Sequence, residues 1–145
     1  MGSTVCQAVE DAEGLELVAR LDVGDPIDAE HLAGARVAVD FTVPDVTEAN
    51  VHALIDAGLD VVVGTTGWTE ESYGRVREHL ARPEAAGRSV LIAPNFALSA
   101  VLSMRFAALA ARYFESAEVI ELHHPNKVDA PSGTATATAK GIAAA

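Results

Sequence analysis

Apolar runs and amphipathic stretches alternate along the chain. Short runs rich in valine, isoleucine and leucine predict strands at 15–21, 36–41, 59–63, 89–93 and 117–122. Stretches with helical spacing predict helices at 4–13, 45–57, 70–80 and 97–114, with a brief helical turn at 27–33. Gly58 is a natural C-cap for the second of these helices, and Thr69 can cap the start of the third. Apolar strands that alternate with helices are typical of a parallel sheet covered on both faces. The pattern therefore predicts a doubly wound parallel-sheet, Rossmann-like α/β fold.

Polar motifs stand at the ends of these predicted strands, where parallel α/β sheets bind their ligands. The motifs are Asp22, Asp40–Thr42, Gly64–Gly67 and Ala93–Phe96. Gly64 and Gly67 would let the backbone approach a ligand closely, and Thr65 and Thr66 add hydroxyl donors. The alternative is a plain strand-to-helix turn that binds nothing.

Asp22 has the spacing of a ribose-binding acid. Such a residue follows the last glycine of a dinucleotide fingerprint by about 20 residues, and Gly2 lies at that distance upstream. An acid at this position favours NADH over NADPH, because a 2′-phosphate would meet a carboxylate. Arg20 is close enough to leave dual use open, and an ordinary turn residue is the alternative for Asp22.

The densest polar cluster follows the last predicted strand, in residues 121–135. Pro125 and Pro131 exclude a continuous helix between them, so His123 and Lys127 lie on a turn. Histidine exchanges protons near neutrality, and lysine supplies a cation that can also donate a proton. The cluster predicts an active-site loop.

A helix start in the same loop favours an anion. Ser132 is a plausible N-cap before an Ala- and Thr-rich helical tail, and the free amides of a helix start attract carboxylate or phosphate. These features indicate an anionic small-molecule substrate. A metal site made by His123, His124 and Asp129 is an alternative, although adjacent strand residues point to opposite faces and do not easily share one ion.

The run Glu-Leu-His-His-x-x-Lys-x-Asp-Ala-Pro-Ser-Gly-Thr-Ala, residues 121–135, closely resembles the signature of the 4-hydroxy-tetrahydrodipicolinate (dihydrodipicolinate) reductase family of the diaminopimelate and lysine pathway. The resemblance implies a cytoplasmic oxidoreductase that reduces 4-hydroxy-tetrahydrodipicolinate to tetrahydrodipicolinate with NADH or NADPH. It implies that His123 is the proton donor or acceptor and Lys127 the proton donor. It implies substrate contacts at His124, Gly133 and Thr134. It implies cofactor contacts at Gly64, Thr65, Thr66, Ala93, Pro94, Asn95 and Phe96.

The sequence departs from the family pattern in two ways. The family opens with a strand and a Gly-x-x-Gly-x-x-Gly loop, whose last glycine corresponds to Gly2, and it continues beyond the Ser-Gly-Thr turn. We therefore expect a partial dinucleotide-binding domain over 1–96 that lacks its first strand. We expect the start of an incomplete α+β substrate domain over 97–145. Ser99 stands where the family commonly has glycine, which affects local packing beside the nicotinamide.

Two alternatives remain for function: another nicotinamide-dependent dehydrogenase of an amino-acid-like dicarboxylate, and an inactive or nucleotide-sensing fragment. A family-like homotetramer is expected only of a full-length protein. The net charge of −11 argues against nucleic-acid or anionic-membrane partners. A single cysteine excludes an internal disulfide and fits a reducing compartment. We find no signal peptide and no apolar run long enough to span a bilayer.

Overall fold

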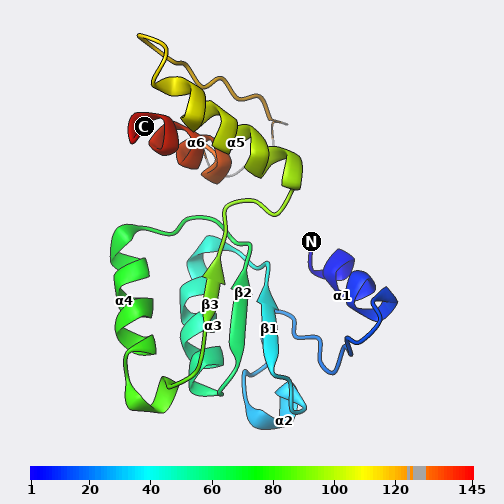
Figure 1. Cartoon of the computed structure of the whole chain (residues 1–145). Coiled ribbons are helices and arrows are strands. Elements are labelled where there is room, and N and C mark those ends of the chain that lie inside the picture. Colours follow the sequence, from blue (N-terminus) through cyan, green and yellow to red (C-terminus); the bar gives the residue numbers. More distant parts are fainter. Residues whose placement is uncertain (124, 126–129) are drawn as a thin grey trace. The chain divides into compact units, whose positions relative to one another are not determined.

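The computed structural model describes residues 1–123, 125 and 130–145. The chain forms two compact units, Met1–Ile92 and Ala93–Ala145 (Figure 1). The first unit contains a parallel sheet with helices beside it, and the second contains two packed helices.

A three-stranded parallel sheet forms the centre of the first unit. Its strands are β1 (Val37–Asp40), β2 (Asp60–Val63) and β3 (Val90–Ile92), in the order β1-β2-β3. Asp40 pairs with Val63, and Val63 pairs with Ile92, so all three strands end at the same edge of the sheet. The predicted strands at 36–41, 59–63 and 89–93 are therefore confirmed, and so is their parallel arrangement.

The helices of the first unit are α1 (Gly2–Asp11), α2 (Ala29–Leu32), α3 (Pro44–Asp56), α4 (Glu70–Leu80) and the 3₁₀ helix η1 (Pro83–Ala85). Helix α3 lies against β1 and β2, and α4 packs beside α3 (Figure 1). Gly58 ends α3 as its sequence predicts. Its φ of +83° is readily available to glycine, and its N–H donates to Ile55 O at 2.9 Å.

One face of the sheet carries the core. Val51 and Ile55 of α3 and Val61 and Val63 of β2 are each less than 2% exposed. Side chains alternate between the two faces of a strand. On the opposite face Val37 and Val39 are 54% and 44% exposed, as the alternation dictates. On this face, the β1 side chains are therefore partly open to solvent in the described chain.

Two predicted strands are wrong. Residues 15–21 and 117–122 are not paired into any sheet of the described chain. A strand exists only where a neighbour completes its backbone hydrogen bonds. The described sheet has only three members, and the described residues of the second unit contain no strand. Both segments have the apolar pattern of strands, but no segment of the described chain pairs with them.

The second unit consists mainly of α5 (Leu98–Ala111) and α6 (Gly133–Ala143), which pack against each other. The predicted helix at 97–114 is confirmed, although α5 ends three residues earlier, at Ala111. Neither helix contains a fully buried residue. Among the described residues we find no helix of the length and apolarity that a membrane span requires.

Candidate active site

A buried carboxylate lies at the carboxyl end of β1. Asp40 is 5% exposed and accepts hydrogen bonds on Oδ1 from the Thr47 and Thr65 hydroxyls, at 3.1 and 2.8 Å. The same oxygen accepts from the Thr42 amide and hydroxyl, at 3.1 and 2.9 Å. Oδ2 accepts from Asn50 Nδ2 at 3.1 Å. Asp40 thus joins the ends of β1 and β2 to the first turns of α3.

The two glycines of the Gly64–Gly67 turn make room for the protein itself. A Cβ on Gly64 would lie 2.0 Å from Cε1 of Phe41, so only glycine fits beside that ring. Gly67 has a φ of +93°, and a Cβ there would lie 2.8 Å from Cβ of Pro44. The close backbone approach predicted at these positions is thus an approach to the segment that follows β1.

Thr65 is fixed from two sides. Its side chain is buried, with 6% of the residue exposed, and its hydroxyl donates to Asp40. Its carbonyl accepts a hydrogen bond from the indole Nε1 of Trp68 at 3.1 Å. The Thr65 hydroxyl, predicted as a ligand donor, is therefore engaged inside the protein. Thr66 is only half-buried.

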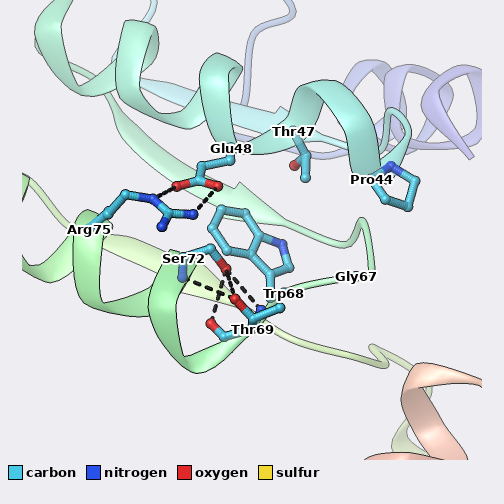
Figure 2. Close-up of a pocket in the computed structure, with 8 residues that line it drawn as sticks. All are labelled: Pro44, Thr47, Glu48, Gly67, Trp68, Thr69, Ser72 and Arg75. Carbon is cyan, nitrogen blue, oxygen red and sulfur yellow. Dashed lines mark hydrogen bonds and ion pairs between the residues drawn. The ribbon is translucent and has the colours of Figure 1, made fainter.

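A small pocket of about 140 Å³ lies between the start of α3 and the start of α4 (Figure 2). Its lining residues are Pro44, Thr47, Glu48, Gly67, Trp68, Thr69, Ser72 and Arg75. Thr69 is the N-cap of α4, as predicted: its hydroxyl accepts from the Ser72 amide at 3.2 Å. Sites for drug-sized ligands occupy roughly 300–1,000 Å³. This pocket is therefore too small to hold a dinucleotide.

The charged walls of this pocket satisfy each other. Arg75 donates from Nε and Nη2 to the two carboxylate oxygens of Glu48, at 2.6 and 2.9 Å (Figure 2). The hydrogen bonds from Arg75 lower the pKa of the Glu48 carboxyl below its ordinary value. This is a bidentate pair between α3 and α4, and it leaves the pocket without an uncompensated charge from either partner.

Asp22 lies in an exposed turn that follows the unpaired segment 15–21. Its Oδ1 accepts from the Val23 amide at 2.7 Å, and its own amide donates to Oδ2 of Asp25 at 2.8 Å. Arg20 forms an ion pair with Glu10. The predicted strand that Asp22 was to end is absent, and the predicted ribose contact stays a prediction.

In the second unit, a predicted cofactor residue contacts a predicted substrate residue. Asn95 Nδ2 donates to Thr134 Oγ1 at 3.1 Å, and Asn95 Oδ1 accepts from the Ala97 amide at 2.8 Å. Asn95 thereby links the segment Ala93–Phe96, just before α5, to the first turn of α6. Thr134, which Asn95 contacts, is the second residue of α6, so the first backbone amides of this helix are those of Gly133 and Thr134.

Glu121, which is not among the residues predicted from the sequence, organises the same region. Its Oε1 accepts from the Ser132 amide at 2.9 Å, and its Oε2 lies 3.7 Å from Nδ1 of His123. Ser132 caps α6 as predicted, because its hydroxyl accepts from the Ala135 amide at 3.0 Å. One carboxylate therefore connects the predicted catalytic histidine to the predicted substrate-binding helix start. In the sequence, the feature that could have pointed to Glu121 was its position in the signature, two residues before His123.

The predicted residues His124 and Lys127 lie outside the described residues, as does Asp129 of the alternative metal site. Within the described ranges, no three histidine, cysteine, aspartate or glutamate side chains are grouped so as to hold a metal ion. The structure thus assembles His123, Gly133, Thr134 and Asn95 in the second unit, and Gly64–Thr66 in the first.

Comparison with known proteins identifies the family. Residues 1–96 match the profile described as dihydrodipicolinate reductase, N-terminus, and residues 99–145 match the profile described as dihydrodipicolinate reductase, C-terminus. The 4-hydroxy-tetrahydrodipicolinate reductase of Beutenbergia cavernae is 70% identical over 144 residues, which are 99% of this chain and 57% of that protein. That of Corynebacterium efficiens is 55% identical, over 100% of this chain and 58% of its own length.

A solved structure agrees with these matches. Dipicolinate-bound dihydrodipicolinate reductase from Paenisporosarcina sp. TG-14 matches with a TM-score of 0.72 and 35% identity, over 99% of this chain and 61% of that one. The match confirms the predicted Rossmann-like α/β class. The chain spans 57–58% of the length of the curated relatives it matches. By sequence and by fold, the chain belongs to the dihydrodipicolinate reductase family.

Proposed function

We propose that this chain carries the catalytic loop of a 4-hydroxy-tetrahydrodipicolinate reductase, an NAD(P)H-dependent enzyme of lysine and diaminopimelate biosynthesis. The proposed reaction is the reduction of 4-hydroxy-tetrahydrodipicolinate to tetrahydrodipicolinate. The observation that carries this proposal is the Asn95–Thr134 hydrogen bond, because it joins a proposed cofactor segment to a proposed substrate-binding helix start. A relative solved with dipicolinate supports a cyclic dicarboxylate as the substrate class.

The donors in the second unit suit a cyclic dicarboxylate. Helix α6 has 11 residues, and its first amides, at Gly133 and Thr134, carry the partial positive charge of a helix N-terminus. A carboxylate of the substrate would accept hydrogen bonds there. His124 would contribute to the same binding in this proposal.

In this proposal, His123 donates the proton that the ring takes up when it is reduced. Its ring is partly accessible, with 39% of the side chain exposed, so a ligand can reach it. The Glu121 carboxylate lies at ion-pair distance from Nδ1 and favours the ring orientation that keeps Nδ1 toward it. Lys127 is the second proposed proton donor. Nicotinamide, when bound, supplies the hydride.

The residues near Asp22 favour NADH as the cofactor. The 2′-phosphate of NADPH needs a nearby cation, and Arg20 already pairs with Glu10. Asp22 would instead accept hydrogen bonds from the ribose of NADH. We therefore expect a higher kcat/KM with NADH than with NADPH.

The direct test follows the oxidation of NADH and of NADPH in the presence of 4-hydroxy-tetrahydrodipicolinate. His123→Ala should lower kcat by about 10²–10⁴-fold, the usual contribution of a positioned acid or base, with little change in the Kd for NADH. The matched control is His31→Ala, which removes an exposed histidine paired with Asp28 in the first unit.

Two results would contradict the proposal. One is a chain that binds NADH but never oxidises it when the substrate is added. The other is a His123→Ala variant that turns over as fast as the His31→Ala control. Faster reduction of an acyclic amino-acid-like dicarboxylate would point instead to another dehydrogenase.

A further inference from the structure

Asp40 is a buried acid whose described neighbours are hydrogen-bond donors. It accepts five hydrogen bonds from four residues, Thr42, Thr47, Asn50 and Thr65. Among the described residues, no ion pair involves it. A carboxylate with 5% exposure is tolerated in such a place only when donors satisfy both of its oxygens, as they do here.

These donors suit a side chain that only accepts hydrogen bonds. Four hydrogen bonds reach Oδ1, and the amide group of Asn50 reaches Oδ2. An asparagine would turn its own NH₂ group toward one of these sets, so the Asn50 amide would have to flip or the threonine hydroxyls would have to rotate to restore the hydrogen bonds. Aspartate, with two acceptor oxygens and no NH₂ group, therefore fits the set as it stands.

The contacts of Asp40 converge on the turn that follows β2. Its backbone carbonyl accepts from the Gly64 amide at 2.9 Å, and its side chain accepts from the Thr65 hydroxyl at 2.8 Å. The Trp68 indole holds the Thr65 carbonyl from the other side. The turn is therefore locked by protein groups before any ligand arrives, which is the condition for preorganised binding.

We propose that Asp40 is the positioning residue of the Gly64–Thr66 turn: by holding Thr65 it fixes the backbone that contacts the nicotinamide cofactor. The part of this inference that concerns the cofactor rests on the proposed function. The part that concerns the turn does not. Asp40 touches no reacting atom in this proposal and acts only through Thr65.

Trp68 provides a spectroscopic readout, because it is the only tryptophan of the chain and it bonds to Thr65. Asp40→Asn should shift the Trp68 emission of the ligand-free protein and speed hydrogen exchange of the Gly64 amide. Far-UV circular dichroism should stay that of the folded chain under the same conditions. A role in general stability alone would not move the emission of a folded sample.

The matched control is Thr47→Val. It removes one hydroxyl that donates to the same oxygen of Asp40, but from α3 and not from the turn. We expect Asp40→Asn to raise the Kd for NADH about tenfold or more, and Thr47→Val to change it less than about threefold. Titration calorimetry with NADH measures both. If Asp40→Asn does not fold, Thr65→Val keeps the carboxylate and removes only the bond between it and the turn.

The outcomes separate the two claims. Unchanged Trp68 emission and unchanged Gly64 exchange in folded Asp40→Asn or Thr65→Val would overturn the positioning role. Equal effects of Asp40→Asn and Thr47→Val would overturn it too, because Asp40 would then serve the packing of α3. A wild-type chain that does not bind NADH would refute the proposed function and the cofactor part of the inference. In that case, Trp68 emission and Gly64 hydrogen exchange would still decide whether Asp40 positions the turn.

Discussion

The two units of this chain bury their apolar side chains very differently. In the first unit, Val51 and Ile55 of α3 are completely removed from solvent by β2 and its neighbours. In the second unit, Leu98 and Phe106 of α5 are 73% and 61% exposed, although α5 is the more apolar helix by composition. An apolar sequence therefore shows which side chains a segment can bury, but packing partners decide which of them it does bury.

Polar side chains behave alike in the two units. Asp40 collects donors from the turn that follows β2, and Glu121 accepts from the first residue before α6. Each carboxylate connects segments that are distant in sequence, and each does so beside a predicted site residue. Directional hydrogen bonds therefore organise the candidate sites in both units, whether or not an apolar core surrounds them.

The largest difference between the units should appear in stability. Ile55→Ala removes a side chain that is 1% exposed, and we expect it to lower the free energy of unfolding by about 2–5 kcal/mol. Leu98→Ala removes as much carbon from an exposed site in α5, and we expect a change within about 0.5 kcal/mol. Urea denaturation measures both variants, with Trp68 fluorescence for the first unit and far-UV circular dichroism for both.

A Leu98→Ala variant that loses as much stability as Ile55→Ala would contradict this expectation, because it would show that Leu98 of α5 is packed in solution. Equal midpoints of the Trp68 and circular dichroism transitions in wild type would bear on the cooperativity of unfolding. They would show that the two units unfold together in spite of their different cores.

Helix caps should be equally important in the two units, because capping depends on local hydrogen bonds. Thr69→Ala removes the cap of α4, and Ser132→Ala removes the cap of α6. Each should cost about 0.5–2 kcal/mol of helix stability. Thr69→Ser is the control for α4, since serine keeps the capping hydroxyl. The helical circular dichroism signal against temperature tests each one. A cap that matters in α4 alone would mean that α6 is held in place by packing.

The same division between local and distant contacts explains what the sequence could predict. Gly58, Thr69 and Ser132 end or start helices through neighbours within a few residues, so their roles could be read directly. The strands predicted at 15–21 and 117–122 depended on partners elsewhere in the chain, and no local pattern supplies them. A strand pattern predicts that a segment can pair, and the partner decides whether it does.

The candidate site shows the same limit. The signature at residues 121–135 named His123, Gly133 and Thr134, and the structure adds that Asn95 reaches Thr134 across 39 positions. Asp40 was visible as an acid at the end of an apolar strand. Its role was not visible, because it depends on donors up to 25 positions away. Contacts of this length follow from the fold and not from residue spacing.

The smallest expected effect concerns the ion pair that joins α3 to α4. Arg75 holds the pKa of the folded Glu48 carboxyl below its ordinary value of 4.5. A lowered folded pKa means that the pair stabilises the fold above the unfolded pKa, and that this contribution disappears as the pH falls through the folded pKa. Glu48→Gln should therefore destabilise the protein near neutrality, and its difference from wild type should shrink as the pH falls through the lowered folded pKa of Glu48.

The size of this effect is limited by solvent, because the Glu48 side chain is 30% exposed. We expect less than about 1 kcal/mol near neutrality, decreasing further with added salt. The control is Glu84→Gln, which changes an exposed glutamate of η1. Urea denaturation followed by Trp68 emission, at a series of pH values from neutral to acidic and at two salt concentrations, measures the difference. The same two helices are also joined by His52 of α3 and His79 of α4, whose Nδ1 atoms are 2.6 Å apart. A Glu48→Gln penalty that persists at low pH would show that the Glu48 side chain acts by packing against α4.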